Sequence, residues 1–442
     1  MSINLPVRPE PVEGLARAST STARTDVASA LRFITCGSVD DGKSTLIGRL
    51  LVDSKAVLAD QLAGVQRSGE TDLALLTDGL SAEREQGITI DVAYRYFATA
   101  GRKFIIGDAP GHEQYTRNMV TAASSADAAV VLVDATKLQW AQPGLALLPQ
   151  TRRHALLASL LRVPSLVFAI NKLDAVDDPS AAFRHIAAAL AAFSAAAGIE
   201  PRAVVPISAL KGHNVVEPAP GWCGYEGLSL LQVLETLPAT APETGEGFSF
   251  PVQWVEKFSA SSDTSQGRRV FWGRVASGLL APGQEVTVMP SGQPALVAQV
   301  LDHARRPGPV PAGHSAGVVL DREVDVSRGD WLLAPGTAES TRDILATVAW
   351  LDDEPLVAGR VYWALHGHRW VKARVRRIVH KLDIHTLAEQ ETQQLEPNAI
   401  GHVELALQEP LATRPYARSR VLGSLVLVDT ATHKTAGAVL VR

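Results

Sequence analysis

Cysteine is scarce in this chain, because its 442 residues include only Cys36 and Cys223. Two thiols cannot form the framework of several bridges that stabilises small secreted proteins, and such usage is typical of a reducing compartment. We therefore expect a cytoplasmic protein. Cys36 ends an apolar run directly before a glycine, where a small buried thiol is the simplest interpretation.

The chain also lacks an excess of one charge and any long hydrophobic run. Its 42 Lys and Arg against 46 Asp and Glu leave a net charge of −4, so there is no global basic field for gripping nucleic acid. A membrane-spanning helix needs about 18 or more apolar residues in succession, and the run that comes closest is AAVVLV at residues 128–133. We expect a soluble protein that binds neither nucleic acid nor a membrane.

Residues 1–28 are rich in Arg, Ser, Thr and Pro and lack the apolar core of a secretory signal. This composition predicts a disordered leader. The chain is too long for one ordinary hydrophobic core, and a length of this order favours roughly two to four domains.

The remaining chain divides into three parts. Across residues 29–238, apolar runs such as RKFIIGD and SLVFAIN alternate with segments of helical period, which predicts a parallel sheet covered by helices. PATAPETGEG is a plausible linker. Short Val-rich runs separated by Gly and Pro then predict two antiparallel β domains, at residues 247–336 and 341–442, with a break at LAPG between them.

A phosphate-binding loop stands at residues 37–44, GSVDDGKS, between a predicted strand and a predicted helix. Glycines allow the backbone N–H groups to wrap around phosphates, Lys43 adds positive charge, and the Ser44 hydroxyl is placed for Mg²⁺ at a helix N-terminus. The candidate phosphate-binding residues are Gly37, Ser38, Val39, Asp40, Asp41, Gly42, Lys43, Ser44 and Thr45.

A second motif follows in KFIIGDAPGH. Asp108 ends the predicted strand, where its carboxylate can reach Mg²⁺ through water, and the N–H of Gly111 can meet the terminal phosphate. His112 comes next. Between the two motifs, Thr89 in EREQGITI is the candidate to bind Mg²⁺ and the terminal phosphate when a switch segment closes.

Guanine recognition is predicted from NKLD at residues 171–174. The carboxylate of Asp174 can accept from the ring N–H and the exocyclic amine of guanine. Adenine offers neither donor, which can give discrimination on the order of 10⁴. The alkyl stem of Lys172 can lie along the base, and Asn171 can brace neighbouring loops.

The tripeptide SAL, Ser208, Ala209 and Leu210, follows a further predicted strand and can present a backbone N–H to the guanine carbonyl. Alone it carries little information. Because it follows the other three motifs in the expected order along the chain, it favours GTP over ATP.

Together, GSVDDGKS, EREQGITI, DAPGHEQYTRNM, NKLD and SAL resemble a translation-factor-type GTPase, the class that includes elongation factor Tu. More narrowly, residues 31–442 resemble the large, GTPase subunit of bacterial ATP sulfurylase. Ser38 and Asp41 stand where translation factors usually carry histidines, and TRRH at residues 151–154 fits the sulfurylase branch. The resemblance implies an α/β P-loop GTPase domain followed by two antiparallel β-barrel domains.

The resemblance also implies a heterodimer in sulfate assimilation. A small catalytic subunit related to ATP pyrophosphatases would transfer AMP from ATP to sulfate, forming adenosine 5′-phosphosulfate and pyrophosphate, and GTP hydrolysis on this chain would drive that uphill reaction. It implies GTP and Mg²⁺ as ligands, with Ser44, Thr89 and Asp108 at the metal. His112, which would position the attacking water, forms the catalytic group together with Lys43 and Thr89.

Two departures from relatives stand out. Residues 138–150, in KLQWAQPGLALLPQ, form a local insertion that either touches the partner or is a neutral surface loop, and we favour the neutral loop. A second phosphate loop, as in relatives fused to an adenylylsulfate kinase, does not occur in this sequence, so we do not expect that activity.

Two other functions remain open at this point. A translation factor delivering charged tRNA would be expected to carry histidines in the loop and to bind RNA strongly, and a stand-alone GTPase switch would bind other proteins. HGHRWVKARVRRIVHKLD, at residues 366–383, suggests nucleic acid by its basic and aromatic residues. A strand with basic residues on its exposed face explains it more simply. His366 and His368 lack companion ligands of suitable spacing for a metal site.

Overall fold

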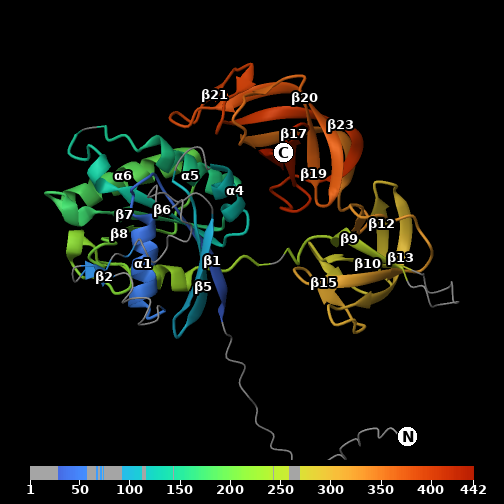
Figure 1. Ribbon diagram of the computed structural model, residues 1–442, viewed down its shortest axis with the longest axis horizontal. Coiled ribbons are helices and arrows are strands. Elements are labelled where there is room, and N and C mark those ends of the chain that lie inside the picture. Colours follow the sequence, from blue (N-terminus) through green and yellow to red (C-terminus); the bar gives the residue numbers. More distant parts are fainter. Residues whose placement is uncertain are drawn as a thin grey trace, which may run out of the picture.

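The computed structural model places three bodies along the chain, an α/β domain followed by two β-barrels (Figure 1). The residues that it describes are 28–56, 66–67, 70–71, 73, 92–111, 116–142, 144–241, 243–257 and 269–442. The predicted leader lies outside these ranges, apart from its last residue, Ala28, which begins the first strand. The predicted fold class, a P-loop α/β domain followed by two antiparallel barrels, is confirmed.

The α/β domain is built on one six-stranded sheet with the order β4-β5-β1-β6-β7-β8. Every neighbouring pair is parallel except β4 and β5, which are antiparallel. The strands are β1 (Ala28–Cys36), β4 (Ala93–Ala98), β5 (Arg102–Asp108), β6 (Ala128–Asp134), β7 (Ser165–Asn171) and β8 (Ala203–Pro206). A separate two-stranded pairing joins β2 (Gln66–Arg67) and β3 (Glu70–Thr71).

Helices cover both faces of this sheet (Figure 1). The α-helices are α1 (Lys43–Asp53), α4 (Thr116–Ala123), α5 (Pro149–Leu160), α6 (Pro179–Ala197) and α7 (Leu230–Thr236), and short 3₁₀ turns are η3 (Ala135–Lys137), η4 (Leu173–Ala175) and η5 (Trp222–Gly224). Because both faces are covered, every residue of β6 and β7 is buried. The carboxyl ends of β1, β5, β6 and β7 therefore meet at one edge, where the predicted nucleotide motifs begin.

Helix α6 is the one described helix that is long and apolar enough to cross a membrane by length and composition alone. Its place in the fold explains that composition. Asp178 caps its start by accepting from Ala181 N, and Gly198 ends it with a φ of 65°. Its buried side, including Ile186 and Leu190, packs into the core of the α/β domain. One side of α6 thus packs on the core, while several of its alanines on the other side are exposed.

The second body is a closed antiparallel barrel with the strand order β10-β15-β13-β12-β16-β9. Alternate residues point into its core. Its elements are β9 (Ser249–Lys257), β10 (Arg269–Arg274), β11 (Leu279–Leu280), β12 (Glu285–Met289), β13 (Gln293–Leu301), β14 (Val310–Pro311), β15 (Ser315–Leu320) and β16 (Trp331–Leu333), of which β11 and β14 pair separately.

The third body closes through six strands in the order β19-β24-β25-β17-β23-β20, with β21 added beside β20. Its elements are β17 (Glu339–Trp350), β18 (Leu356–Val357), β19 (Val361–His366), β20 (Arg369–Leu382), β21 (Glu389–Gln390), β22 (Gln394–Leu395), β23 (Ile400–Thr413), β24 (Ser424–Asp429) and β25 (Thr435–Val441). Strand β20 carries exposed Lys372 and Arg374 between buried Val371, Ala373 and Val375, which confirms the strand interpretation of this basic segment.

The third body packs directly on the α/β domain. Residues of both share one buried hydrophobic cluster, and the hydroxyl of Tyr416 donates to the carbonyl of Leu161 at 2.9 Å. Arg162 donates to the carbonyl of Tyr416 at 2.7 Å, and Arg117 of α4 donates to that of Leu351 at 3.1 Å. The third body, or barrel three, therefore contacts the helices that follow the nucleotide motifs.

Part of the insertion at residues 138–150 packs against the α/β domain, while other residues of the segment are exposed. Leu138 and Leu147 are buried in its core, and Trp140 lies against the same cluster with its carbonyl oxygen 2.8 Å from Nδ1 of His185. The segment therefore contributes to the core of its own domain.

Candidate guanine-nucleotide site

The phosphate loop connects the end of β1 to the start of α1, and two close approaches require glycine. Gly42 has a φ of 93°, and a Cβ there would lie 2.5 Å from Nδ2 of Asn171. A Cβ on Gly111, which follows β5, would lie 2.5 Å from Nζ of Lys43. The two predicted motifs are thus in direct contact at the sheet edge, with no room for a side chain between them.

Lys43 is almost fully buried at the base of the loop. Its ammonium donates to the carbonyls of Ser38 at 2.7 Å and Gly37 at 3.2 Å. Burial lowers the pKa of Lys43, while the charges of Asp108 and Asp41 act in the opposite direction. A buried ammonium that is held by backbone carbonyls inside a glycine-rich turn fits an anionic phosphate as its missing counter-charge.

Asp41 holds the loop from within. One of its oxygens accepts from Ser38 N at 2.5 Å, and the other accepts from Nζ of Lys137 at 2.9 Å. The side chain of Asp41 is fully buried, and burial raises the pKa of this carboxyl against the opposing effect of Lys137. Lys137 also donates to the carbonyl of Val39 and therefore joins η3 to two points of the loop.

Two of the predicted metal-binding residues lie at the same sheet edge, with Asp108 at the end of β5 and Ser44 at the start of α1. Asp108 is buried at the end of β5 and accepts from Oγ1 of Thr35 on β1 at 3.1 Å. Ser44 and Thr45 are half-buried in the first turn of α1, where helix N–H groups are unpaired. Hydroxyl and carboxylate oxygens are the donors that Mg²⁺ prefers, so these residues fit the ion.

Asn171 links the phosphate loop to the base-recognition loop. Its Nδ2 donates to the carbonyl of Asp41 at 2.9 Å, and its Oδ1 accepts from Ala209 N at 2.9 Å. The buried amide of Asn171 therefore fixes the spacing between GSVDDGKS and SAL, as expected for a bracing residue.

The other base-recognition residues surround this brace. Lys172 has a φ of 62°, and its ammonium contacts the carbonyl of Asp40 at 2.5 Å and Oδ2 of Asp134 at 2.7 Å. Asp174 is exposed, which leaves its carboxylate accessible for its predicted contact with a base. Buried Ser208 closes the SAL turn through its hydroxyl, which accepts from Lys211 N at 3.0 Å.

Arg49 of α1 completes the assembly by donating to the carbonyls of Ala209, at 3.1 Å, and Leu210. His112 and Thr89 lie outside the described residues, so their predicted roles stay predictions.

Two family models match the two ends of this chain. The family described as Elongation factor Tu GTP binding domain matches residues 28–243, and the family described as GTP-eEF1A C-terminal domain-like matches residues 343–442. GTP is therefore a ligand of the first domain.

Two curated relatives decide the family. The chain is 41% identical over 430 residues to sulfate adenylyltransferase subunit 1 of Laribacter hongkongensis, covering 95% of this chain and 86% of the relative. It is 45% identical over 425 residues to the protein of the same description from Vibrio campbellii, covering 94% and 86%. This chain belongs to the sulfate adenylyltransferase subunit 1 family.

A third relative is longer. The bifunctional enzyme CysN/CysC of Xylella fastidiosa is 44% identical over 422 residues, and the match covers 93% of this chain but 66% of the relative. The shared part therefore corresponds to the three bodies described above.

The sequence did not predict the residues of α5 that contact the second nucleotide motif. Gln150 at the start of α5 contacts the carbonyl of Gly111 at 3.4 Å and Nε2 of His154 at 3.1 Å. His154 is fully buried, and burial, together with Lys43 and Arg153, lowers its pKa to about 3, so its imidazole is neutral. The motif TRRH thus lies in the first two turns of α5, which contacts the second nucleotide motif through Gln150.

Lys137 was also missed, although a signal for it existed. Asp41 lies inside the predicted phosphate loop, and a carboxylate that is buried there needs a cation. Lys137 follows β6, whose carboxyl end lies beside that of β1, but the sequence predicted only a parallel sheet and not the order of its strands.

Proposed function

We propose that this chain is the GTP-hydrolysing subunit of a heterodimeric sulfate adenylyltransferase in the cytoplasm. It would couple GTP hydrolysis to formation of adenosine 5′-phosphosulfate and pyrophosphate from ATP and sulfate. The observation that carries the proposal is the convergence of Lys43, Asp108 and Asn171 with SAL at one sheet edge, in a chain of the sulfate adenylyltransferase subunit 1 family.

One set of residues would bind the phosphates of the nucleotide, and a second set would bind its base. Lys43 and the backbone of residues 37–45 would hold the phosphates, while Asp174 would select guanine and Asn171 would keep the two sets at a fixed distance. Mg²⁺, held by Ser44, Asp108 and Thr89, would neutralise charge that develops on the phosphate oxygens.

Hydrolysis requires groups that act on the transition state. Lys43 is already positioned by two carbonyls, so little reorganisation is needed when charge builds on the terminal phosphate. His112 directly follows Gly111 and would orient the attacking water. Gly111 would donate its N–H to the terminal phosphate, and its close contact with Lys43 ties the two functions together.

The partner in this proposal is a small catalytic subunit of the ATP-pyrophosphatase type, which would carry ATP and sulfate. The mixed anhydride of phosphate and sulfate is strongly uphill, so its synthesis needs a second source of free energy. The packing of the third body on α4 and α5 offers a physical connection between the nucleotide site and the rest of the molecule.

A translation factor delivering tRNA is less well supported. The loop carries Asp41, paired with Lys137, where that class usually has a histidine. On β20, Arg376 and Arg377 pair with Asp343 and Glu404. Such neutralised arginines reduce the basic surface that RNA binding needs.

Nucleotide turnover tests the proposal. GTP hydrolysis would be measured for the chain alone, with the small subunit, and with ATP and sulfate added. We expect turnover to rise only with the complete set. A rate that responds to ribosomes, or to none of these additions, would contradict the proposal while leaving GTP binding intact.

A further inference from the structure

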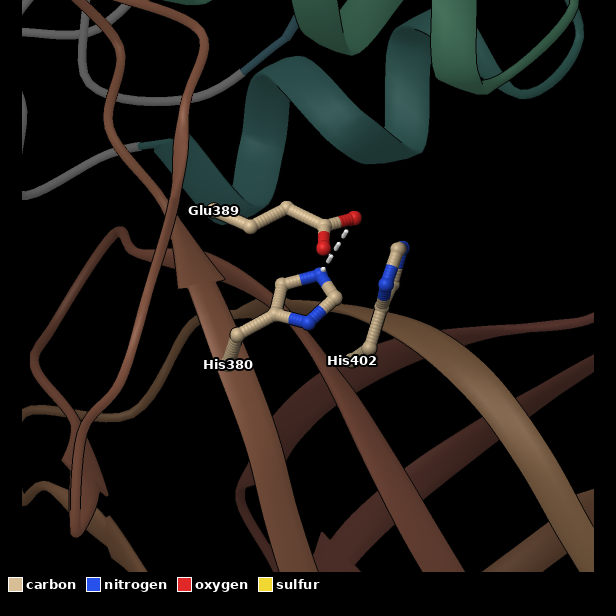
Figure 2. Close-up of side chains that lie close together, drawn as sticks. All are labelled: His380, Glu389 and His402. Carbon is tan, nitrogen blue, oxygen red and sulfur yellow. Dashed lines mark ion pairs between the residues drawn. The ribbon is translucent and has the colours of Figure 1, made fainter.

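Two histidines and a glutamate gather on the third body, far in sequence from the nucleotide motifs (Figure 2). They are His380 on β20, Glu389 on β21 and His402 on β23. One potential ligand atom from each residue lies within 4.8 Å of the others. This is the one such group of His, Cys, Asp or Glu found among the described residues.

The sheet register brings the three side chains together. His380 and His402 face each other as a cross-strand pair, with ring centroids 4.2 Å apart. Leu382, two residues after His380, pairs with Glu389, so the glutamate lies diagonally opposite the histidine. Cross-strand and diagonal neighbours on one face are within reach of long side chains, and Nε2 of His380 lies 3.1 Å from Oε1 of Glu389.

We propose that His380, Glu389 and His402 form a binding site for Zn²⁺ or a similar divalent transition-metal ion. Two imidazoles and one carboxylate are a ligand set that Zn²⁺ accepts, with a fourth position left to water. Bonds of about 2.0–2.2 Å to each ligand require only small side-chain rotations from the observed cluster. The His380 side chain is 12% exposed and the Glu389 side chain 64%, so an ion can enter from solvent.

Arg442 would compete with that ion for the imidazole of His402. Its Nη1 lies 2.7 Å from Nδ1 of His402, and its positive charge opposes a metal cation beside the same ring. Arg442 is exposed and its backbone N donates to the carbonyl of Leu345 at 3.0 Å, so the guanidinium can swing away while the strand end stays in place.

The site would brace the part of barrel three that packs on the α/β domain. The turn between β20 and β21 carries Ile384 and Leu387, which pack against the α/β core, and the carbonyl of His385 accepts from Arg152 of α5 at 2.5 Å. An ion that joins β21 to β20 and β23 would fix this turn against α5. The role is therefore structural, and it does not depend on the proposed reaction.

Metal titration of the full, untagged chain tests the proposal, with GDP and Mg²⁺ saturating the nucleotide site. Zn²⁺ binding would be followed by calorimetry and Co²⁺ binding by visible absorption, which is far stronger for four- or five-coordinate Co²⁺ than for the aqueous ion. We expect one ion per chain. Because replacing even a residue that supports a ligand costs about 10–100-fold in affinity, His380→Ala and His402→Ala should each weaken binding at least about 10-fold.

Three further variants sharpen the outcome. Glu389→Gln changes an exposed residue that does not endanger folding and should also weaken binding, whereas Arg442→Gln should tighten it by about 10-fold. His303→Ala, at an exposed histidine of the second body, should bind like the unaltered chain. Absence of a stoichiometric ion in the unaltered chain, or full affinity in the Glu389 and both histidine variants, would overturn the proposal.

Hydrogen exchange gives a second readout. Zn²⁺ should slow amide exchange in residues 380–390 of the unaltered chain but not of the Glu389→Gln variant. Equal exchange with and without the ion, in a chain that binds it, would contradict the bracing role.

Discussion

At the scale of single residues, we predict that Asp174 selects the base, whereas the buried pair of Asp41 and Lys137 holds the phosphate loop. Asp174 is exposed beside a rigid brace, so its carboxylate is free to meet the edge of a base. Asp41, in contrast, is buried, and its Oδ1 lies 2.9 Å from Nζ of Lys137, whose positive charge compensates that of the carboxylate. The two aspartates therefore give different phenotypes when altered.

Asp174→Asn should move preference from guanine towards xanthine, because the amide can donate to the carbonyl that replaces the exocyclic amine. Buried hydrogen bonds to a charged group are worth about 1.5–3 kcal/mol each, so the ratio of GTP to xanthosine triphosphate affinity should fall by about 100-fold or more. Equilibrium binding of both nucleotides measures it. An unchanged ratio would refute the assignment of Asp174.

His112→Ala should lower GTP hydrolysis far more than GTP binding, because a residue that orients water acts on the transition state. The contribution of such a positioned group is typically about 10²–10⁴-fold in rate. Single-turnover hydrolysis and equilibrium binding separate the two effects. Equal losses in both would rule out this role.

Lys137→Met should leave Asp41 buried without its cation. We expect a loss of about 1–3 kcal/mol in the free energy of unfolding at neutral pH, which is below the range for fully buried pairs because the Lys137 side chain is 33% exposed. The pKa of Asp41 is already raised by burial, and losing Lys137 raises it further. Chemical denaturation measures this loss for each variant.

The pH dependence of that loss has a defined sign. A carboxyl whose folded pKa is raised is tolerated when protonated and destabilises the fold as it ionises, so the deficit of Lys137→Met should grow from acidic to neutral pH. Adding Asp41→Asn to Lys137→Met should recover most of it. A deficit that is constant with pH and is not relieved by the double change would disprove the pairing argument.

At the scale of elements, turns in barrel three are held by carboxylates that accept several backbone N–H groups. Asp429 ends β24 and accepts from Thr432 N at 2.8 Å, Ala431 N at 3.0 Å and Nη2 of Arg360 at 2.9 Å. These bonds hold the pKa of Asp429 well below its usual range. The turn that joins β24 to β25 therefore depends on an ionised side chain.

Asp429→Asn should make barrel three less stable at neutral pH. A carboxyl whose pKa is lower in the folded than in the unfolded state stabilises the fold fully at a pH above its unfolded pKa. That stabilisation is lost as the pH falls from the unfolded pKa through the folded pKa. The difference in urea midpoint between the variant and the unaltered chain should therefore be largest above pH 5 and shrink towards pH 2. A difference that persists unchanged to pH 2 would show that shape, not charge, holds the turn.

At the scale of the whole molecule, contacts between the α/β domain and barrel three connect the nucleotide motifs to the C-terminal body. Gln150 at the start of α5 touches Gly111, while Leu161 just beyond its end accepts from Tyr416 of barrel three. One rigid helix thus spans from the second nucleotide motif to the domain interface. We expect this helix to transmit a change at the phosphate to the third body.

Tyr416→Phe should loosen this interface, because the buried carbonyl of Leu161 loses its donor at a cost of about 1–3 kcal/mol. Amide exchange at the end of α5 should accelerate by roughly 10-fold for each 1.4 kcal/mol. Tyr362→Phe is the matched control, because the hydroxyl of this buried tyrosine has no hydrogen-bond partner among the described residues. Equal exchange in both variants would contradict the proposed contact.

The prediction from sequence succeeded where information is local. Residues 37–44 and 171–174 are short segments whose chemistry follows from residue type and from the strands beside them, and alternating or continuous apolar runs revealed the sheet and both barrels. Lys137, Gln150 and Tyr416 are different, because their partners are distant in sequence and their roles depend on packing. The cluster of His380, Glu389 and His402 depends likewise on the register of three strands, which periodicity does not fix.

If GTP hydrolysis on this chain drives sulfate activation, as we propose, product formation must depend on it. Adenosine phosphosulfate would be measured with the small subunit, ATP and sulfate in the presence of GTP, of a non-hydrolysable GTP analogue, and of no guanine nucleotide. We predict accumulation above the uncoupled equilibrium level only with GTP, with GTP consumed in step with product. Equal product levels in all three conditions would show that GTP hydrolysis does not drive the reaction.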